Sequence, residues 1–293
     1  MMTVFRAMRG AVVINGYLNS GSFREPADMM VEAGKRHGVP FDIFCNTDLS
    51  VRIGDADALG DILGDVDFIV FWDKDVKVAK NLEICGYPVI NCSECIRICD
   101  DKALTHLTLA EYGIPSIETV MSPMSFGNPY DDWGSRPKAQ FGYPMVVKDC
   151  VGSFGEQVRL VKDDSDLVSE MKDGGAKIFQ PYVECGSEDL RLQVVGDRVV
   201  ASVRRVAADG DFRANSSHGG TMVKYDPSEE ERALAVEAAA AVQADFAGVD
   251  IIRGEDGPMV CEVNSNAHIT NLKNATGIDV SDSILEYIMD VLQ

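Results

Sequence analysis

The sequence predicts a chain of mixed class, with an α/β N-terminal third built on a parallel sheet and two α+β lobes after it. Three observations predict this. Strand-like apolar runs alternate with helix-like segments over residues 10–91. From about residue 93 the pattern changes to one long helix and then to short strands with glycine-rich turns. Two hairpins follow, at 189–206 and 248–264, and a groove is expected between the two lobes.

Residues 10–91 carry the signals of strands joined by helices. Amphipathic stretches predict helices at 26–38, closed by Gly38, and at 77–86. Strands connected through helices pair in parallel, so a small doubly wound sheet is expected. No G-x-G-x-x-G follows the first strand, and a dinucleotide site is therefore not supported. The short apolar runs that predict the strands are AVVING (11–16), FDIFCN (41–46), DFIVFWD (67–73) and PVIN (88–91).

The rest of the chain predicts short antiparallel strands with covering helices. The segment 93–113 is expected to be one long helix that begins at Ser93. A helix at 164–175 is expected to have Asp164 or Ser165 as its N-terminal cap. The other expected elements are strands at 143–150 and 177–183, hairpin turns at Gly196-Asp197 and at 255–258, and helices at 227–246 and 281–293.

Composition and charge narrow the classes of function. Hydrophobic residues make up 46% and charged residues 25% of the 293, as in an ordinary globular protein. The net charge is −20 and no basic stripe could neutralise phosphates, so no nucleic-acid partner is expected. No apolar run approaches the roughly 20 residues that span a bilayer, and no membrane partner is expected. Residues 1–9 are expected to be a loose leader, and the protein is expected to be cytoplasmic.

The second hairpin carries a candidate metal site. Asp250 lies on its first strand, and Glu262 and Asn264 lie two apart on its second, so these two share one face. The short turn would place Asp250 opposite them. Three oxygen ligands on a rigid sheet suit Mg²⁺, whose other ligands would be water and phosphate oxygens. The alternative is the polar outer face of an ordinary hairpin, although the apolar neighbours in GVDII and MVCEV favour a site.

Two other stretches could approach a nucleotide. Lys148 ends an apolar strand and the turn GSFGEQ follows, so a point charge and backbone N–H groups could both reach phosphate oxygens. An ordinary turn is the alternative, and this is not a Walker loop because no G-K-S/T follows. In KIFQPYVECGSEDLR (177–191), the C=O of Pro181 and the N–H of Val183 could meet an adenine edge. A plain linker between lobes is the alternative there.

Arginines gather in SVRRVAADGDFRANSSHGG (202–220). Arg204, Arg205 and Arg213 lie near Asn215 and His218. Planar guanidinium groups suit phosphate and carboxylate oxygens. A surface loop held by salt bridges is the alternative.

Three of the eight cysteines lie in NCSECIRICDDK (91–102), where with His106 they form the pattern C-x2-C-x3-C-x6-H. Cys95 and Cys99 are four apart, so they lie on one face of the expected helix and can pack there as thiols. His106 is roughly 10 Å further along the helix, too far to share one ion with them. Packed reduced thiols are therefore favoured over a zinc site, and the stretch matters because its helix carries Lys102.

The order of these signals resembles the ATP-grasp superfamily: a helix lysine, a strand lysine with a glycine loop, a hinge, an Arg–Asn pair and D…E-x-N. GDFRANSSHGG, AGVDIIR, and EVN followed by TGIDV resemble its RimK-type branch of alpha-L-glutamate-ligase-like enzymes. The likeness covers essentially the whole chain and is strongest over 98–280. It implies an ATP-grasp fold that encloses a nucleotide: an N-terminal pre-ATP-grasp domain at 1–97, a central lobe with a glycine-rich lid at 98–182, and a C-terminal lobe with the Mg²⁺ site at 183–293.

The resemblance also implies roles for individual residues. Two lysines and the glycine lid would contact the phosphates of ATP, and four hinge residues would hold adenine. Two acids would bind the ribose or position the nucleotide, an Arg–Asn pair would face the phosphates, and three oxygen ligands would hold two Mg²⁺ ions, which Mn²⁺ could replace. The two lysines are Lys102 and Lys148, and the lid residues are Gly152, Ser153, Phe154 and Gly155. The hinge residues are Gln180, Pro181, Tyr182 and Val183, and the two acids are Glu184 and Asp189. The Arg–Asn pair is Arg213 and Asn215, and the Mg²⁺ ligands are Asp250, Glu262 and Asn264.

The family joins a carboxylate to an amine with ATP. The carboxylate is phosphorylated, the amine attacks the acyl phosphate, and phosphate leaves. Lys148 and Arg213 would have catalytic roles, with Arg213 stabilising the acyl phosphate and the later oxyanion. The implied substrates are a peptide or small molecule with a carboxylate and an amino-acid amine donor such as glutamate, and relatives often form homo-oligomers. Two alternatives stay open: a dipeptide ligase of the D-alanine–D-alanine type, and a nucleotide-binding regulator without turnover.

The acceptor side departs from the family pattern. The family hinge often carries an acid where Pro181 stands, and many relatives read Ser-Pro-Gly where this chain reads Ser-Asn-Ala before His268. His268 could orient an acceptor or act as a base, and the alternative is a plain loop residue. The loop 15–23 and WDKD (72–75) are expected to contribute to the acceptor pocket, with Lys74 binding a substrate carboxylate.

Overall fold

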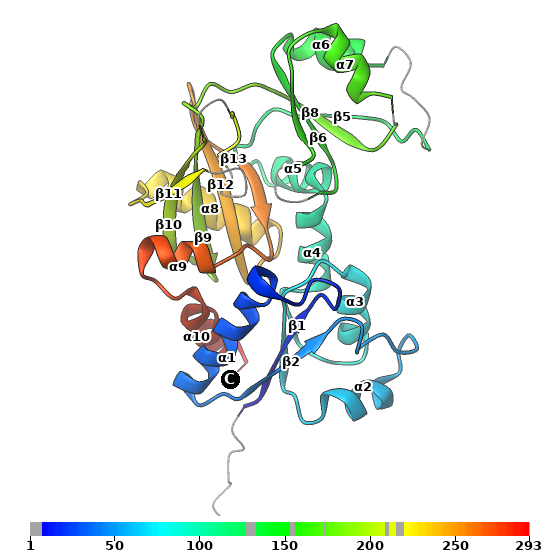
Figure 1. Cartoon of the computed structure of the whole chain (residues 1–293), viewed down its shortest axis with the longest axis vertical. Coiled ribbons are helices and arrows are strands. Elements are labelled where there is room, and N and C mark those ends of the chain that lie inside the picture. Colours follow the sequence, from blue (N-terminus) through cyan, green and yellow to red (C-terminus); the bar gives the residue numbers. More distant parts are fainter. Residues whose placement is uncertain are drawn as a thin grey trace, which may run out of the picture.

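Three sheets organise the described part of the chain (Figure 1). The computed structural model describes residues 8–126, 133–152, 156–172, 174–208, 211–214 and 220–292. The first sheet is formed within the N-terminal third, the second within the central part, and the third within the C-terminal part. The predicted combination of a parallel α/β part with two antiparallel α+β parts is confirmed.

The first sheet is parallel throughout, as predicted. Side chains alternate along its strands, so Val12 packs on one face and Val13 on the other. The first face is covered by α1 (Glu25–His37), and the second by α2 (Ala56–Leu63) and α3 (Val76–Ile84). The sequence reasoning had not identified α2. In spatial order, the strands are β2 (Phe41–Cys45), β1 (Gly10–Ile14), β3 (Phe68–Phe71) and β4 (Val89–Ile90).

The long helix predicted at 93–113 is in fact two helices, α4 (Ser93–Asp100) and α5 (Lys102–Glu111). Asp101 separates them because its backbone is extended, with φ −108° and ψ 109°, and pairs with Val151 in an isolated bridge. The Asp101 side chain accepts hydrogen bonds from two N–H groups in the first turn of α5, which makes it the cap of that helix. The chain therefore restarts a helix at Lys102.

The second sheet is small and antiparallel. Its spatial order is β5 (Val120–Met121), β8 (Lys177–Pro181), β6 (Met145–Asp149) and β7 (Val158–Val161). A small apolar core joins it to α6 (Ser135–Phe141) and α7 (Asp164–Glu170). The prediction that Asp164 or Ser165 caps α7 is wrong. Asp163 is the cap, because its backbone is extended and its carboxylate accepts from the N–H groups of the next turn.

The third sheet contains both predicted hairpins. Its spatial order is β11 (Thr221–Lys224), β10 (Arg198–Val206), β9 (Glu188–Val195), β12 (Phe246–Gly254) and β13 (Gly257–Asn264). One face packs against α8 (Glu229–Ala241), and part of the other packs against α9 (Thr270–Thr276) and α10 (Val280–Val291). The helix predicted at 227–246 ends earlier, because Phe246 is already part of the buried strand β12.

The N-terminal and C-terminal parts share one apolar core. Trp72 stacks on Phe246 with 5.1 Å between ring centroids. Asn91, which is fully buried, donates to the C=O groups of Phe246 and Ser265 and accepts from the Phe246 N–H. In Figure 1 the second sheet extends away from the N-terminal and C-terminal parts that share this core. The domain boundaries at 97/98 and 182/183 stay a prediction, and α4 crosses the first of them.

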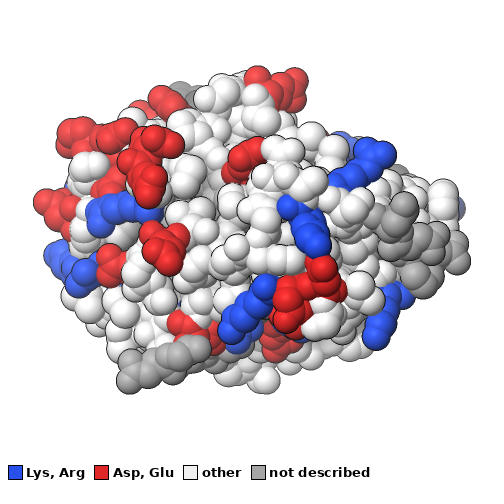
Figure 2. All heavy atoms as spheres, turned by 90° about the horizontal axis from the view of Figure 1, so that it is seen from above, with Lys and Arg blue, Asp and Glu red and all other residues white. Residues whose placement is uncertain are grey.

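Acidic side chains are prominent on the surface (Figure 2), in agreement with the net charge of −20. On the face drawn in Figure 2, acidic side chains gather toward one side, and the lysines and arginines among the described residues are scattered. In the described part of the chain, no helix combines the length and apolar character that crossing a bilayer requires.

Candidate active site

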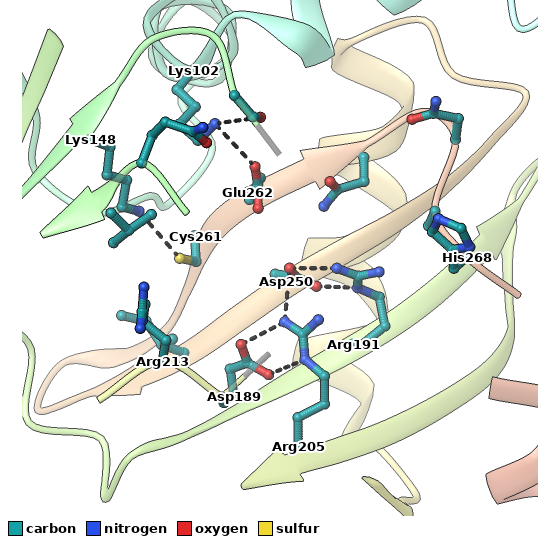
Figure 3. A pocket seen from close by; sticks show the side chains of 18 of the residues that line it. Lys102, Lys148, Asp189, Arg191, Arg205, Arg213, Asp250, Cys261, Glu262 and His268 are labelled. Atoms are coloured by element: carbon teal, nitrogen blue, oxygen red, sulfur yellow. Dashed lines mark hydrogen bonds and ion pairs between the residues drawn. The ribbon is translucent and has the colours of Figure 1, made fainter. Parts of the chain in front are cut away.

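A cavity of about 660 Å³ lies where the three sheets meet (Figure 3). Of the predicted site residues that the structure describes, all except Glu184 line it. Glu184 is exposed beside the cavity-lining Val183. Ser153, Phe154, Gly155 and Asn215 lie outside the described residues. The predicted residues that line the cavity are Lys102, Lys148, Gly152, Gln180, Pro181, Tyr182, Val183, Asp189, Arg213, Asp250, Glu262 and Asn264.

The hairpin of β12 and β13 places the candidate metal ligands together. Asp250 pairs directly with Glu262, which confirms the prediction that it lies opposite this face of β13, and Gly248 pairs with Asn264. Val249 and Val263 are buried in the core shared with α8, and their neighbours Asp250, Glu262 and Asn264 line the cavity. Cys261 lines it too, because the register shift interrupts the alternation of β13 at this point. The predicted convergence of three oxygen ligands at one place on the sheet is therefore present.

Asp250 is also the centre of a buried ion-pair network (Figure 3). Arg191 binds it at two points, with Nη2 donating to Oδ2 at 2.7 Å, and Arg205 Nη2 lies 2.9 Å from the same oxygen. Arg205 also donates twice to Asp189, at 2.6 Å for both bonds. Arg205 and Asp250 are almost fully buried, so each charge depends on the others for compensation. The floor of the cavity is a chain of alternating charges.

Burial and pairing act in opposite directions on these groups. Burial would raise the pKa of Asp250, but Arg191 and Arg205 hold that pKa below its ordinary value. Burial raises the pKa of Asp189 even though Arg205 opposes the shift. Burial would lower the pKa of Arg205, but Asp250 and Asp189 raise it above its ordinary value. Asp250 is therefore the carboxylate of this network that is most firmly ionised.

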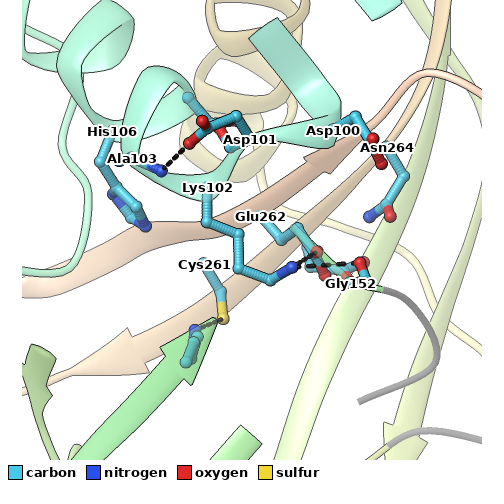
Figure 4. Close-up of polar contacts among 12 residues, drawn as sticks. Asp100, Asp101, Lys102, Ala103, His106, Gly152, Cys261, Glu262 and Asn264 are labelled. Atoms are coloured by element: carbon cyan, nitrogen blue, oxygen red, sulfur yellow. Dashed lines mark hydrogen bonds and ion pairs between the residues drawn. The ribbon is translucent and has the colours of Figure 1, made fainter. Parts of the chain in front are cut away.

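Two lysines, Lys102 and Lys148, face the β13 side of the cavity (Figure 3), and Figure 4 shows the contacts of Lys102 more closely. Lys102 Nζ lies 3.6 Å from Glu262 Oε1 and donates to the C=O of Gly152 at 3.3 Å. Lys148, from β6, is buried and lies 3.7 Å from the Sγ of Cys261. Lys102 is brought there by the helix restart, because its backbone N–H donates to a carbonyl that follows β6. Lys102 thus contacts the Glu262 carboxylate, and Lys148 contacts the thiol of the residue before it on β13.

The predicted hinge lies at the end of β8. Gln180 is buried, and its amide nitrogen is 2.9 Å from both His106 Nε2 and Thr119 Oγ1. Its amide oxygen has no hydrogen-bond partner among the described groups. Burial, followed by the charges of Lys148 and Lys102, lowers the pKa of His106 to about 3. His106 is therefore neutral and has a part in the hinge rather than in a metal site.

Arg213 and Asp189, for which the resemblance implied contacts with the nucleotide, both form ion pairs with protein side chains. Arg213 lines the cavity while donating to both carboxylate oxygens of Asp211, at 3.1 Å from Nε and 2.9 Å from Nη2. Asp189 lines it too, but both of its oxygens accept from Arg205. Their predicted roles toward phosphate and ribose stay predictions.

The cysteine stretch is a packed helix face. Cys95 and Cys99 are buried, with 4.0 Å between their sulfurs, and all eight cysteines are free thiols. Within the described residues, no three His, Cys, Asp or Glu side chains form a cation-binding group. The predicted Mg²⁺ ligands are two carboxylates and one amide, so they are a set of a different kind.

The N-terminal part contributes one end of the cavity, as expected for residues 15–23 and 72–75. Asn15, Phe23, Asp73 and Lys74 are among the lining residues, and Lys74 forms an ion pair with Asp100 of α4. His268 lies nearby, with its ring 5.8 Å from that of Phe23, and burial lowers its pKa.

Sequence reasoning missed Arg191 and Asp73. Arg191 lies two positions after Asp189 on β9, so the period of a strand places it on the same face. That signal was available once the first hairpin had been predicted. Asp73 was included only as part of WDKD, and its burial could not be seen from the sequence.

Comparison with known proteins adds three likenesses. The family model for the RimK-like ATP-grasp domain matches residues 99–288. The chain is 37% identical over 216 residues to a probable alpha-L-glutamate ligase of Legionella pneumophila (strain Corby), covering 72% of this chain and 70% of that protein. It is 33% identical over 226 residues to N-acetylaspartylglutamate synthase A of Homo sapiens, covering 75% of this chain and 57% of that protein.

One solved structure shows how far the likeness of fold extends. It is that of a RimK domain protein ATP-grasp from Sphaerobacter thermophilus DSM 20745, with a TM-score of 0.72 at 21% identity. The match covers 95% of this chain and 98% of that chain, so it includes the N-terminal sheet as well as the two lobes.

Proposed function

The chain belongs to the RimK-like ATP-grasp family of ATP-dependent carboxylate–amine ligases, and from that premise we propose that it joins the amine of L-glutamate to a carboxylate of a peptide or small molecule. The names of both curated relatives refer to glutamate, which supports this choice of amine. One observation carries the proposal. Lys102 and Lys148 face Glu262 and its neighbour Cys261 across the cavity, so positive and negative groups converge where a phosphate chain would lie.

The proposed reaction uses these groups to place and neutralise charge. An oxygen of the carboxylate substrate attacks the γ-phosphorus of ATP, and the bond from that phosphorus to the oxygen of ADP breaks. The substrate ammonium loses one proton to solvent, the neutral amine nitrogen attacks the acyl carbon, and the C–O bond to phosphate breaks. The second proton leaves the nitrogen as the amide forms and passes to the departing phosphate. No protein nucleophile is required, because phosphoryl transfer depends mainly on in-line placement and electrostatic stabilisation. Lys102, Lys148 and Arg213 supply positive charge at the phosphates.

The residues present fit Mg²⁺, with one restriction. Glu262 and Asn264 line the cavity with oxygen atoms of the kind that Mg²⁺ prefers. Asp250 already receives three arginine N–H contacts, which leaves it about one of the four lone-pair positions of a carboxylate. We place two ions at this set, and when bound they would neutralise the charge that develops on the phosphates. Asp250 would hold its ion with a single oxygen, Oδ1.

A turnover assay tests the proposal. Purified protein with ATP, Mg²⁺, L-glutamate and a panel of peptide and small-molecule carboxylates should release ADP, and mass spectrometry should detect the amide product. Hydroxylamine added in place of the amine should trap the acyl phosphate as a hydroxamate. ATP binding without ADP release across the panel would favour a nucleotide-binding regulator. ADP release with D-alanine as the only amino acid would favour a dipeptide ligase.

A further inference from the structure

The N-terminal end of the cavity holds a buried acid that the nucleotide chemistry does not use. Asp73 follows β3, and Asn15 follows the neighbouring strand β1. The carboxyl ends of parallel strands meet at one edge of a sheet, where open α/β sheets bind ligands. Both side chains line the cavity, and only 7% of Asp73 is exposed.

The hydrogen-bond donor to the Asp73 carboxylate is a neutral group, because the Asn15 amide donates to it at 3.1 Å. The Asn46 amide, which is also neutral, donates to the nearby Asp75 at 3.4 Å. No basic side chain among the described residues lies within ion-pair distance of it, and Asp75 adds a charge of the same sign. Burial raises its pKa, which is the expected effect of desolvation without a cation. A buried carboxylate in this condition is stabilised by a cation that arrives from outside.

The basic groups at the same end are already balanced. Lys74 Nζ pairs with Asp100, and Arg191 pairs with Asp250. Both nonetheless have more N–H groups than these pairs use, because an ammonium has three donors and a guanidinium has five. This end of the cavity therefore offers one uncompensated negative charge beside donors suited to carboxylates. A zwitterionic amino acid has the complementary arrangement of one ammonium and at least one carboxylate.

We propose that Asp73, oriented by Asn15, binds the ammonium group of the amino-acid substrate, and that Lys74 binds the adjacent carboxylate. This inference rests on the proposed function, because it assigns the amine substrate of that reaction to the N-terminal end of the cavity. It makes Asp73 a determinant of specificity: the site selects amino acids over dicarboxylic acids of the same length that lack the amine.

The test compares two ligands and three variants. L-glutamate carries the ammonium group, and glutarate has the same carbon chain and both carboxylates without it. For Asp73→Asn, we expect the KM for L-glutamate to rise at least about 10-fold, because a buried charge pair is lost. The inhibition constant of glutarate should stay the same or fall, and the KM for ATP should not change. Asp73→Glu keeps the charge and should recover part of the affinity for L-glutamate.

Asp61→Asn is the matched control. It makes the same change at an exposed carboxylate of α2 that does not line the cavity. It should leave all three constants unchanged. An unchanged KM for L-glutamate in Asp73→Asn would overturn the proposal, as would a parallel rise for L-glutamate, glutarate and ATP, which would indicate a structural role.

A separate measurement keeps this inference distinct from the proposed function. Absence of glutamate-dependent ADP release by the unmodified protein would count against the proposed function itself. Calorimetric binding of L-glutamate and glutarate, with a non-hydrolysable ATP analogue present, still tests Asp73 in that case. A preference for L-glutamate that disappears in Asp73→Asn supports the site, and equal binding of the two ligands by the unmodified protein overturns it.

Discussion

His106 gives a prediction whose size can be worked out from its environment. Its pKa is lowered to about 3 in the folded protein, because the ring is buried and lies near Lys148 and Lys102. In the unfolded chain it is about 6.5. As the pH falls below about 6.5, the unfolded chain takes up a proton that the folded protein does not, so acid favours unfolding. Between pH 7 and pH 5 this one group should lower the free energy of unfolding by about 2 kcal/mol.

The variant His106→Gln isolates this contribution. Gln cannot titrate, and its side-chain oxygen can replace Nε2 as the acceptor for the Gln180 amide. Urea titrations followed by circular dichroism at pH 5, 6 and 7 give the free energy of unfolding of both proteins. The other titrating groups are common to both proteins and cancel when the free energy of unfolding of the variant is subtracted from that of the unmodified protein. The value of this subtraction should fall by about 2 kcal/mol from pH 7 to pH 5. A difference that does not change with pH would refute the reasoning.

Three further predictions concern the cavity. Arg205→Met leaves Asp189 and Asp250 without their shared cation, so the free energy of unfolding should fall by about 3–5 kcal/mol in denaturant titrations; a loss under about 1 kcal/mol would contradict a buried ion-pair network. Glu262→Gln should reduce ADP release by about 100-fold at an unchanged melting temperature, and full activity would argue against a metal ligand there. Lys148→Ala should raise the KM for ATP about 10-fold or more, whereas the exposed Lys138→Ala should not.

Local patterns predicted most of the fold because most elements have a clear period and clear ends. Gly38 has a positive φ of 73° and closes α1, as its position after the amphipathic run indicated. The break at Asp101 was missed because its residues keep a helical period on both sides, and the extended backbone is fixed by pairing with Val151, 50 residues later. Contacts over that distance leave no trace in a local pattern.

The candidate site was predictable where it lies within one hairpin. The hairpin brings Asp250 close to Glu262, but the register set by the turn alone would place Asp250 opposite Cys261. A register shift between Asp250 and Ile251 makes Glu262 the partner, and no residue pattern in the hairpin announced that irregularity. The pairing of Asp250 with Arg191 and Arg205 depends on which strands become neighbours in the third sheet, and β12 pairs with β9, about sixty residues earlier in the sequence. The charge balance of the cavity floor is therefore a property of sheet order.

The restart of the helix at Lys102 has a consequence for how the chain tolerates change in length. In one continuous helix, a single inserted residue would rotate every later side chain by about 100° and shift it by about 1.5 Å. Here α5 is held by the Asp101–Val151 bridge and by the bond from the Lys102 N–H to the Cys150 carbonyl. The direction of Lys102 is therefore set by contacts with the segment that follows β6 and not by the phase of α4. A residue inserted between α4 and Asp101, after the packed face of α4, should disturb Lys102 less than the same insertion within α5.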